Sequence, residues 1–182
     1  MTEYGARPAD GGVVLHTRTP EETRRVGATI ANALRPGDVI ALTGELGAGK
    51  TCLVQGAAAA LGVAERVTSP SFLLRRDYRG DVPVIHLDVY RLDTLSEVAG
   101  LGYDDVGEGP GVAFIEWGDA MAPLLPADHL EVELRLGDPT VNGDALAEER
   151  CICLRAHGDD WRRRLQVLAG ALAQWEAEDG SC

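Results

Sequence analysis

The stretch Gly44-Glu45-Leu46-Gly47-Ala48-Gly49-Lys50-Thr51 decides how the remainder of this sequence is interpreted. It fits G-x-x-x-x-G-K-[ST], the pattern of a phosphate-binding loop. Glycines allow the backbone to wrap closely, so that successive N–H groups face a phosphate. In this pattern Lys50 supplies positive charge to the β- and γ-phosphates, and the Thr51 hydroxyl is a ligand for Mg²⁺. We therefore predict that every residue of the stretch belongs to a nucleotide site.

The flanking residues supply the context that this motif requires. Residues 38–43 are mostly apolar and partly β-branched, which is typical of a buried parallel strand. Residues 52–61 are rich in alanine and therefore favour a helix. The N-terminus of that helix would face the same phosphate. We prefer this strand–loop–helix interpretation to a glycine-rich turn that precedes Lys50 and Thr51 by chance.

Length and charge limit the possible functions. The chain has 182 residues and a formal net charge of −12, enough for one domain but unfavourable for binding nucleic acid alone. We expect tails at residues 1–11 and 179–182 around a single domain at 12–178. No charged-then-apolar leader and no 18-residue apolar run is present, which predicts a cytoplasmic protein without membrane association.

Cysteine and arginine patterns give weaker signals. The four cysteines form no C-x-x-C pair, so we expect free thiols rather than a zinc site. Two arginine clusters occur, one at Arg75, Arg76 and Arg79 and one at Arg162–Arg164. Such clusters are either solvated faces or contacts for a partner or RNA.

Two apolar strands are expected to end in carboxylates beside the phosphate loop. The strand at residues 82–88 ends in Asp88, where a carboxylate would meet Mg²⁺ at the carboxyl edge of a sheet. His86 would share a face with Asp88. The apolar strand expected at 111–119 carries Glu116, in the arrangement of an acid near the metal and the attacking water. The alternative for Glu116 is a surface residue that closes a strand, and Trp117 belongs either to the core or to the nucleotide site.

Hydroxyl groups provide two further candidates. Pro70 forces Ser69 out of helical geometry, so Thr68 and Ser69 lie on an extended segment. This segment is either a γ-phosphate-sensing switch or an ordinary loop. Thr19 precedes Pro20 and Glu22 in a capping-box pattern, so it either caps a helix that runs to about Leu34 or also lies near the nucleotide.

The rest of the chain predicts mixed structure. We expect a strand at 13–17, a hairpin of strands at 73–78 and 82–88, a short helix at 95–99, strands at 129–136 and 150–156, and a last helix, capped by Asp159 or Asp160, through Trp175. The D-x-x-G at Asp104–Gly107 is not taken as a GTPase motif. No apolar strand precedes it, and no N-K-x-D guanine motif exists in the sequence.

Several segments together resemble the bacterial TsaE (YjeE) family over roughly residues 12–136. They are Gly44–Thr51, Thr68–Phe72, His86–Leu92 and Ile115–Trp117. The resemblance implies an α/β P-loop NTPase fold, with a mainly parallel central sheet, antiparallel additions and flanking helices. It also implies ATP and Mg²⁺ as ligands and TsaB and TsaD as partners.

The same resemblance implies a role in forming the threonylcarbamoyl group on adenosine 37 of tRNAs that read ANN codons (t6A). ATP hydrolysis would reset the complex between turnovers, and tRNA would be contacted indirectly, through the partners. We expect Lys50, Asp88 and Glu116 to be catalytic. Metal ligands would be Thr51, Asp88 and Glu116, and the phosphate loop, Thr19, Thr68, Ser69 and Trp117 would bind ATP. A small-molecule kinase and a nucleotide-switched regulatory module are the alternatives.

Overall fold

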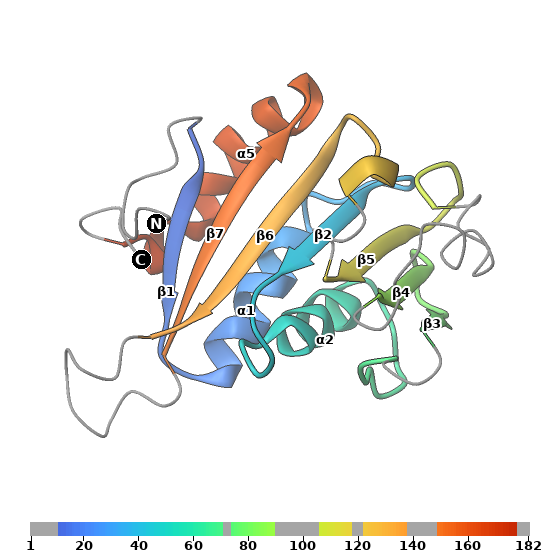
Figure 1. Ribbon diagram of the computed structural model, residues 1–182, viewed down its shortest axis with the longest axis horizontal. Coiled ribbons are helices and arrows are strands. Elements are labelled where there is room, and N and C mark those ends of the chain that lie inside the picture. The colour runs from blue at the N-terminus through green and yellow to red at the C-terminus, as the bar shows by residue number, and fades with distance from the viewer. Residues whose placement is uncertain (1–10, 71–73, 90–105, 118–121, 138–148, 178–182) are drawn as a thin grey trace.

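The computed structural model describes residues 11–70, 74–89, 106–117, 122–137 and 149–177 (Figure 1). Its strands are β1 (Val13–Thr17), β2 (Val39–Thr43), β3 (Arg75–Tyr78), β4 (Val84–Asp88), β5 (Val112–Glu116), β6 (His129–Leu136) and β7 (Arg150–His157). Its helices are α1 (Pro20–Ala31), α2 (Lys50–Ala60), α5 (Asp159–Leu172) and the 3₁₀ helix η4 (Ala173–Trp175). The expected helix at 95–99, the tails except Gly11, and Asp104–Asp105 lie outside the described residues, and the domain limits 12–178 stay a prediction.

The strands form one seven-stranded sheet in the order β1-β7-β6-β2-β5-β4-β3. The four strands β6, β2, β5 and β4 run parallel to one another. The neighbours β7 and β3 are antiparallel to this centre, and β1 is antiparallel to β7. The predicted α/β fold, with a mainly parallel centre and antiparallel additions, is therefore confirmed.

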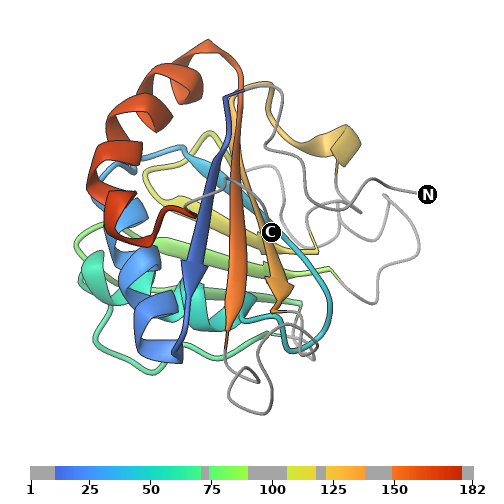
Figure 2. The same ribbon diagram turned by 90° about the vertical axis from the view of Figure 1, so that its left-hand side faces the viewer.

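The three longer helices α1, α2 and α5 pack against the same face of the sheet (Figure 2). The main core lies between them and includes Ile30 of α1, Leu53 of α2, Leu165 of α5 and Phe114 of β5. A smaller apolar cluster around Ile115 lies on the opposite face. Because side chains alternate along a strand, residues two apart share a face. His86, Asp88 and Glu116 therefore lie on the face that the helices cover.

The local predictions hold for most of the described chain. The predicted strands at 13–17 and 129–136 have the expected bounds. The predicted hairpin is confirmed, since β3 and β4 are antiparallel with Tyr78 opposite Val84. The cap of α1 is also confirmed, because the Thr19 hydroxyl accepts from Glu22 N at 3.1 Å. In the expected capping box, the Glu22 carboxylate would accept a hydrogen bond from Thr19 N. In the structure, Glu22 Oε2 accepts from Arg18 N at 2.7 Å instead.

The expected cap of the last helix is wrong. Gly158 precedes α5 and has no side-chain cap bond of its own, and its φ of 77° lies in the left-handed region that glycine tolerates. Asp128, which lies before β6, supplies the acceptor instead: its Oδ1 accepts from Asp160 N at 3.0 Å and from Trp161 N at 3.4 Å. A carboxylate distant in sequence can satisfy the first amides of a helix as well as a local one.

The expectation of free thiols also needs correction. Cys52 and Cys153 keep reduced thiols, but Cys151 is disulfide-bonded. Cys151 and Cys153 share one face of β7, as expected, and pack with Val14 and Ala177. The three longer helices do not cover this face, so Cys151 lies outside the main core. Separately, no helix in the described residues is long and apolar enough to cross a membrane.

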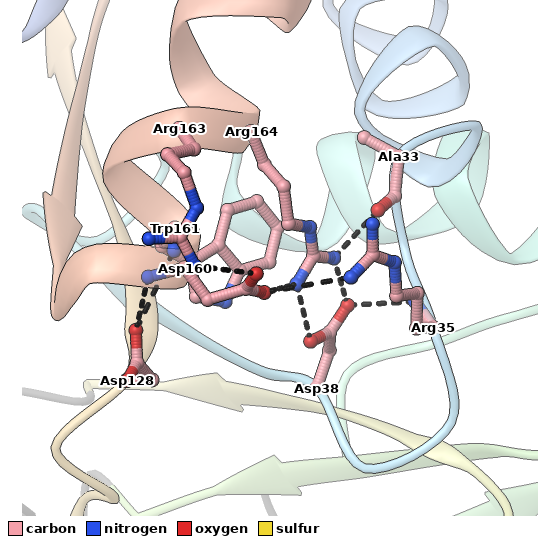
Figure 3. Close-up of polar contacts among 8 residues, drawn as sticks. All are labelled: Ala33, Arg35, Asp38, Asp128, Asp160, Trp161, Arg163 and Arg164. Carbon is pink, nitrogen blue, oxygen red and sulfur yellow. Dashed lines mark hydrogen bonds and ion pairs between the residues drawn. The ribbon is translucent and has the colours of Figure 1, made fainter.

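Arg164 belongs to a buried polar cluster and not to a solvated face (Figure 3). Its side chain is 9% exposed and pairs with Asp38, whose side chain is 12% exposed, through both guanidinium Nη atoms. The guanidinium lies 3.8 Å from the centre of the Trp161 ring and also donates to the carbonyl of Ala33. These contacts fasten α5 to the turn between α1 and β2.

We predict that Arg164→Ala lowers the free energy of unfolding by about 3–5 kcal/mol, because it leaves the Asp38 carboxylate buried without its partner. The matched control on the same helix is Arg162→Ala, which breaks an ion pair between side chains that are 59% and 84% exposed. We expect that change to stay within about 0.5 kcal/mol. Urea unfolding of both variants measures the difference, and equal losses would contradict the structural role of Arg164.

His129 and His157 stack across β6 and β7, with ring centres 4.2 Å apart and planes inclined by 5°. Burial lowers the pKa of His129; the His157 charge acts in the same direction, while the Pro126 carbonyl, Glu131 and Asp128 oppose it. Protonation of His129 is therefore less favourable in the folded chain than in the unfolded chain. Stability that depends on neutral His129 is present above the ordinary histidine pKa of about 6.5 and is lost as the pH falls below it.

We predict that the free energy of unfolding decreases as the pH is lowered from 7.5 to 5.5. In the His129→Gln variant this decrease should be smaller. Urea unfolding at several pH values makes the comparison. A pH dependence in His129→Gln identical to that of wild type would show that His129 is not the group responsible.

Candidate functional site

The phosphate loop connects β2 to α2 through backbone conformations that need glycine. Gly44, Gly47 and Gly49 have φ values of 125°, 83° and 105°. Gly44 has a second constraint, because a Cβ atom there would lie 2.1 Å from the carbonyl oxygen of Leu134 on β6. The close approach of β6 thus requires glycine at the first position of the loop. Glu45, Leu46 and Gly47 are exposed at its tip, whereas Ala48 is buried.

Lys50, the first residue of α2, turns its side chain back across the loop. Its ammonium donates to the carbonyls of Gly44 at 2.6 Å and Glu45 at 2.9 Å. The residue is only 5% exposed, and its Nζ lies 4.0 Å from the centre of the Trp117 ring. The carbonyls and the aromatic ring compensate for removing a cation from water. The charge is therefore held at the mouth of the loop rather than in open solvent.

The two predicted carboxylates meet at the carboxyl edge of the parallel strands. Asp88 of β4 lies opposite Glu116 of β5 in the register of the sheet. They are 3% and 4% exposed. The Thr51 hydroxyl of α2 donates to Glu116 Oε1 at 2.6 Å. The structure thus brings together all three residues that we predicted as metal ligands.

The segment around Ser69 is tied to the same edge. The Ser69 hydroxyl donates to Asp88 Oδ2 at 2.7 Å. The hydroxyl of Tyr78 accepts from Thr68 N at 3.2 Å and donates to Thr68 O at 3.1 Å, which fixes the backbone just before Ser69. The Thr68 hydroxyl accepts from Arg76 at 3.3 Å. Of the two hydroxyls left open by the sequence, Ser69 is the one that contacts a site carboxylate.

Trp117 and Thr19 had two possible roles each. Trp117 contributes to both of its expected environments, since it packs against the smaller apolar cluster and faces the Lys50 ammonium. Its φ of 62° is unusual for a residue other than glycine and turns the chain immediately after Glu116. The Thr19 hydroxyl has the cap bond already described, and a contact from Thr19 to a nucleotide stays a prediction.

Three residues around the site were not among the predicted site residues. His86, fully buried, places Nε2 2.9 Å from Glu116 Oε1. Tyr78 holds Thr68, as described above. Arg150 at the start of β7 donates to the carbonyl of Gly47 at 3.3 Å. The H-x-D spacing was a signal for His86, but no local pattern points to Arg150, which is 103 residues away from Gly47 in the chain.

The oxygen atoms of the three predicted metal ligands suit a hard cation that also binds phosphate oxygens. Thr51, Asp88 and Glu116 offer only oxygen atoms, which Mg²⁺ prefers. In the described part of the chain no group of three or more His, Cys, Asp or Glu residues could hold a metal by itself. This agrees with the usual binding of Mg²⁺, in which one or two carboxylates act with substrate phosphates and waters. Because the Thr51 hydroxyl gives its single proton to Glu116, its lone pairs stay available for a cation.

Comparison with known proteins supports one family. Residues 17–141 match the family model of the threonylcarbamoyl adenosine biosynthesis protein TsaE. The tRNA threonylcarbamoyladenosine biosynthesis protein TsaE of Bacillus subtilis is 40% identical over 155 residues, covering 84% of this chain and 91% of the relative. The protein of the same name from Streptomyces coelicolor is 39% identical over 152 residues, covering 81% and 99%.

A solved structure agrees with the sequence comparisons. The crystal structure of Bacillus subtilis YdiB superposes with a TM-score of 0.72 and 30% sequence identity, and the match covers 93% of this chain and 99% of that one. The similarity thus extends over almost the whole chain. From the matched family model and these relatives, we conclude that the chain belongs to the TsaE family.

Proposed function

We propose that this protein is a Mg²⁺-dependent ATPase of t6A biosynthesis, which acts in the cytoplasm with TsaB and TsaD. The names of its relatives support the pathway. The observation that carries the ATPase proposal is the convergence of Thr51, Asp88 and Glu116 directly beside the phosphate loop. The protein would support formation of the threonylcarbamoyl group on adenosine 37 without transferring that group itself.

The phosphates of ATP would lie in the loop of Gly44–Thr51. The backbone N–H groups of the loop and the N-terminus of α2 provide donors for them. The Lys50 ammonium lies beside the carbonyls of Gly44 and Glu45. A small movement of this side chain would bring the ammonium onto the β- and γ-phosphates. Trp117 packs over the lysine and limits the access of water to it.

The hydroxyl and the two carboxylates would then serve hydrolysis. Thr51, Asp88 and Glu116 would hold Mg²⁺, which supplies charge neutralisation for the β- and γ-phosphate oxygens. Glu116, at the end of a buried strand, would orient the attacking water. Ser69 would exchange its bond with Asp88 for a contact near the γ-phosphate, and so report the state of the nucleotide. Catalysis of this kind depends mainly on positioning and on charge.

The predicted hydrolysis is slow without partners. In related phosphate-loop enzymes an arginine supplied in trans accelerates turnover by about 10³–10⁵. We expect ATP hydrolysis by the purified chain to rise at least about tenfold when TsaB and TsaD of the same host are added. Lys50→Ala should abolish both rates. A steady-state phosphate-release assay with competing nucleotides measures rate and base preference together.

Three other outcomes would replace the proposal. A rate indifferent to TsaB and TsaD would leave an ATPase outside the proposed complex. Tight ATP binding without turnover, with or without the pair, would favour a nucleotide-switched module. Transfer of the γ-phosphoryl group to a metabolite would favour a small-molecule kinase.

Glu116 and Asp88 should affect different steps. We predict that Glu116→Ala lowers kcat by about 10²–10⁴ while the Kd for ATP changes less, because its main role is to orient water. Asp88→Ala should instead weaken the part of ATP binding that depends on Mg²⁺. Titration of a fluorescent ATP analogue with and without Mg²⁺, together with the rate assay, separates these effects.

The matched control for both variants is Glu133→Ala. Glu133 lies on β6 of the same sheet, half-buried and paired with Arg135 and Arg155, but on the face away from the site. Its substitution should leave kcat and nucleotide affinity unchanged. An unchanged kcat in Glu116→Ala would contradict the assignment of Glu116.

A further inference from the structure

His86 lies beneath the site and contacts one of its carboxylates. It is fully buried on β4, and its register partner on β5 is Phe114, two residues before Glu116. Its Nε2 lies 2.9 Å from Glu116 Oε1. The rings of His86 and Tyr78 have their centres 6.4 Å apart. His86 therefore contacts a carboxylate of the site from a fully buried position in the sheet.

The environment of the second ring nitrogen determines where the proton lies. His86 Nδ1 is buried and has no hydrogen-bond partner among the residues that the structure describes. A proton on Nδ1 would be a buried donor without an acceptor, which is rare in proteins, whereas a lone pair there is tolerated better. This arrangement favours a proton on Nε2, whose N–H donates to Glu116 Oε1.

Two donors from different elements converge on the same carboxylate oxygen. Thr51 on α2 donates to Oε1 at 2.6 Å, and His86 on β4 donates to it at 2.9 Å. Together they fix the rotation of the carboxyl group and leave Oε2 as the oxygen with open coordination. A neighbour that fixes a catalytic ligand in this way typically contributes about 10–100-fold to activity.

We propose that His86 is the positioning residue of Glu116: its Nε2–H holds Oε1 so that Oε2 is presented to the attacking water and the metal. This inference rests on the proposed ATPase function. His86 does not contact the substrate in this arrangement and acts only through Glu116. The residue belongs to the site because it provides a donor at a defined point, and an apolar side chain of similar volume would not replace it.

The kinetic test compares a variant that retains a donor with one that lacks it. His86→Gln places an amide N–H near the position of Nε2, and His86→Leu removes the donor. We expect His86→Leu to lower kcat by about 10–100-fold with the Kd for ATP within about threefold of wild type. His86→Gln should recover most of the lost rate. If the two variants lose kcat equally, or if His86→Leu loses none, the proposal is wrong.

A second histidine–glutamate pair on the same sheet provides the matched control. His157 Nε2 lies 2.8 Å from Glu131 Oε2, on the face away from the site. His157→Leu and His157→Gln should leave kcat unchanged. Urea unfolding of all four variants separates lost positioning from lost stability, because the Gln and Leu variants of His86 should then differ in kcat even where their stabilities agree.

A measurement without ATP keeps the inference testable if the ATPase proposal fails. Long-range ¹H–¹⁵N NMR of the nucleotide-free wild-type protein reports the tautomer of each histidine. His86 should show a proton on Nε2, and assignment by His86→Gln identifies its signals. An Nε2 without a proton would overturn the proposal. Absence of ATP hydrolysis in wild type would remove the proposed function, while the tautomer would still decide whether His86 holds Glu116 as described.

Discussion

The hydrogen bond from Thr51 to Glu116 joins the two halves of the site, and the surrounding structure depends on it. Thr51 is the second residue of the helix that follows the phosphate loop, whereas Glu116 ends a central parallel strand. The Thr51 hydroxyl oxygen and Glu116 Oε1 are 2.6 Å apart. The bond is possible because β5 lies beside β2, the strand that leads into the loop. In a parallel sheet the carboxyl ends of neighbouring strands meet at one edge. That edge therefore receives both the loop and the carboxylates.

Burial makes the polar contacts of this site interdependent. Lys50, Asp88 and Glu116 are almost inaccessible, and a buried charge is costly unless it is paired or hydrogen-bonded. The Lys50 ammonium donates to two loop carbonyls and faces the Trp117 ring. The Asp88 carboxylate accepts from Ser69. The Glu116 carboxylate has contacts with Thr51 and His86. Any ligand that displaces one of these contacts changes the balance of the others. A nucleotide bound as proposed would therefore alter several of these contacts at once.

Much of the fold and part of the site could be predicted from local patterns. The phosphate loop, the alternation in β6 and the cap of α1 are short-range signals, because glycine conformations, strand periodicity and capping act within a few residues. The carboxylates were found because an acid after an apolar strand has a known place at a sheet edge. In contrast, the Asp128 cap of α5 and the pairing of Arg164 with Asp38 depend on contacts between distant segments. No window of sequence contains both partners of such a contact.

The sequence by itself determined that this chain has a phosphate-binding loop between a strand and a helix, and which acids could accompany it. Only the tertiary structure decided that Ser69 contacts Asp88, that Tyr78 holds Thr68, and that His86 and Thr51 share one oxygen of Glu116. The physical reason is one of range. Loop chemistry follows from backbone conformations of adjacent residues, whereas hydrogen-bond partners across a sheet follow from strand order and register, which the whole core sets together.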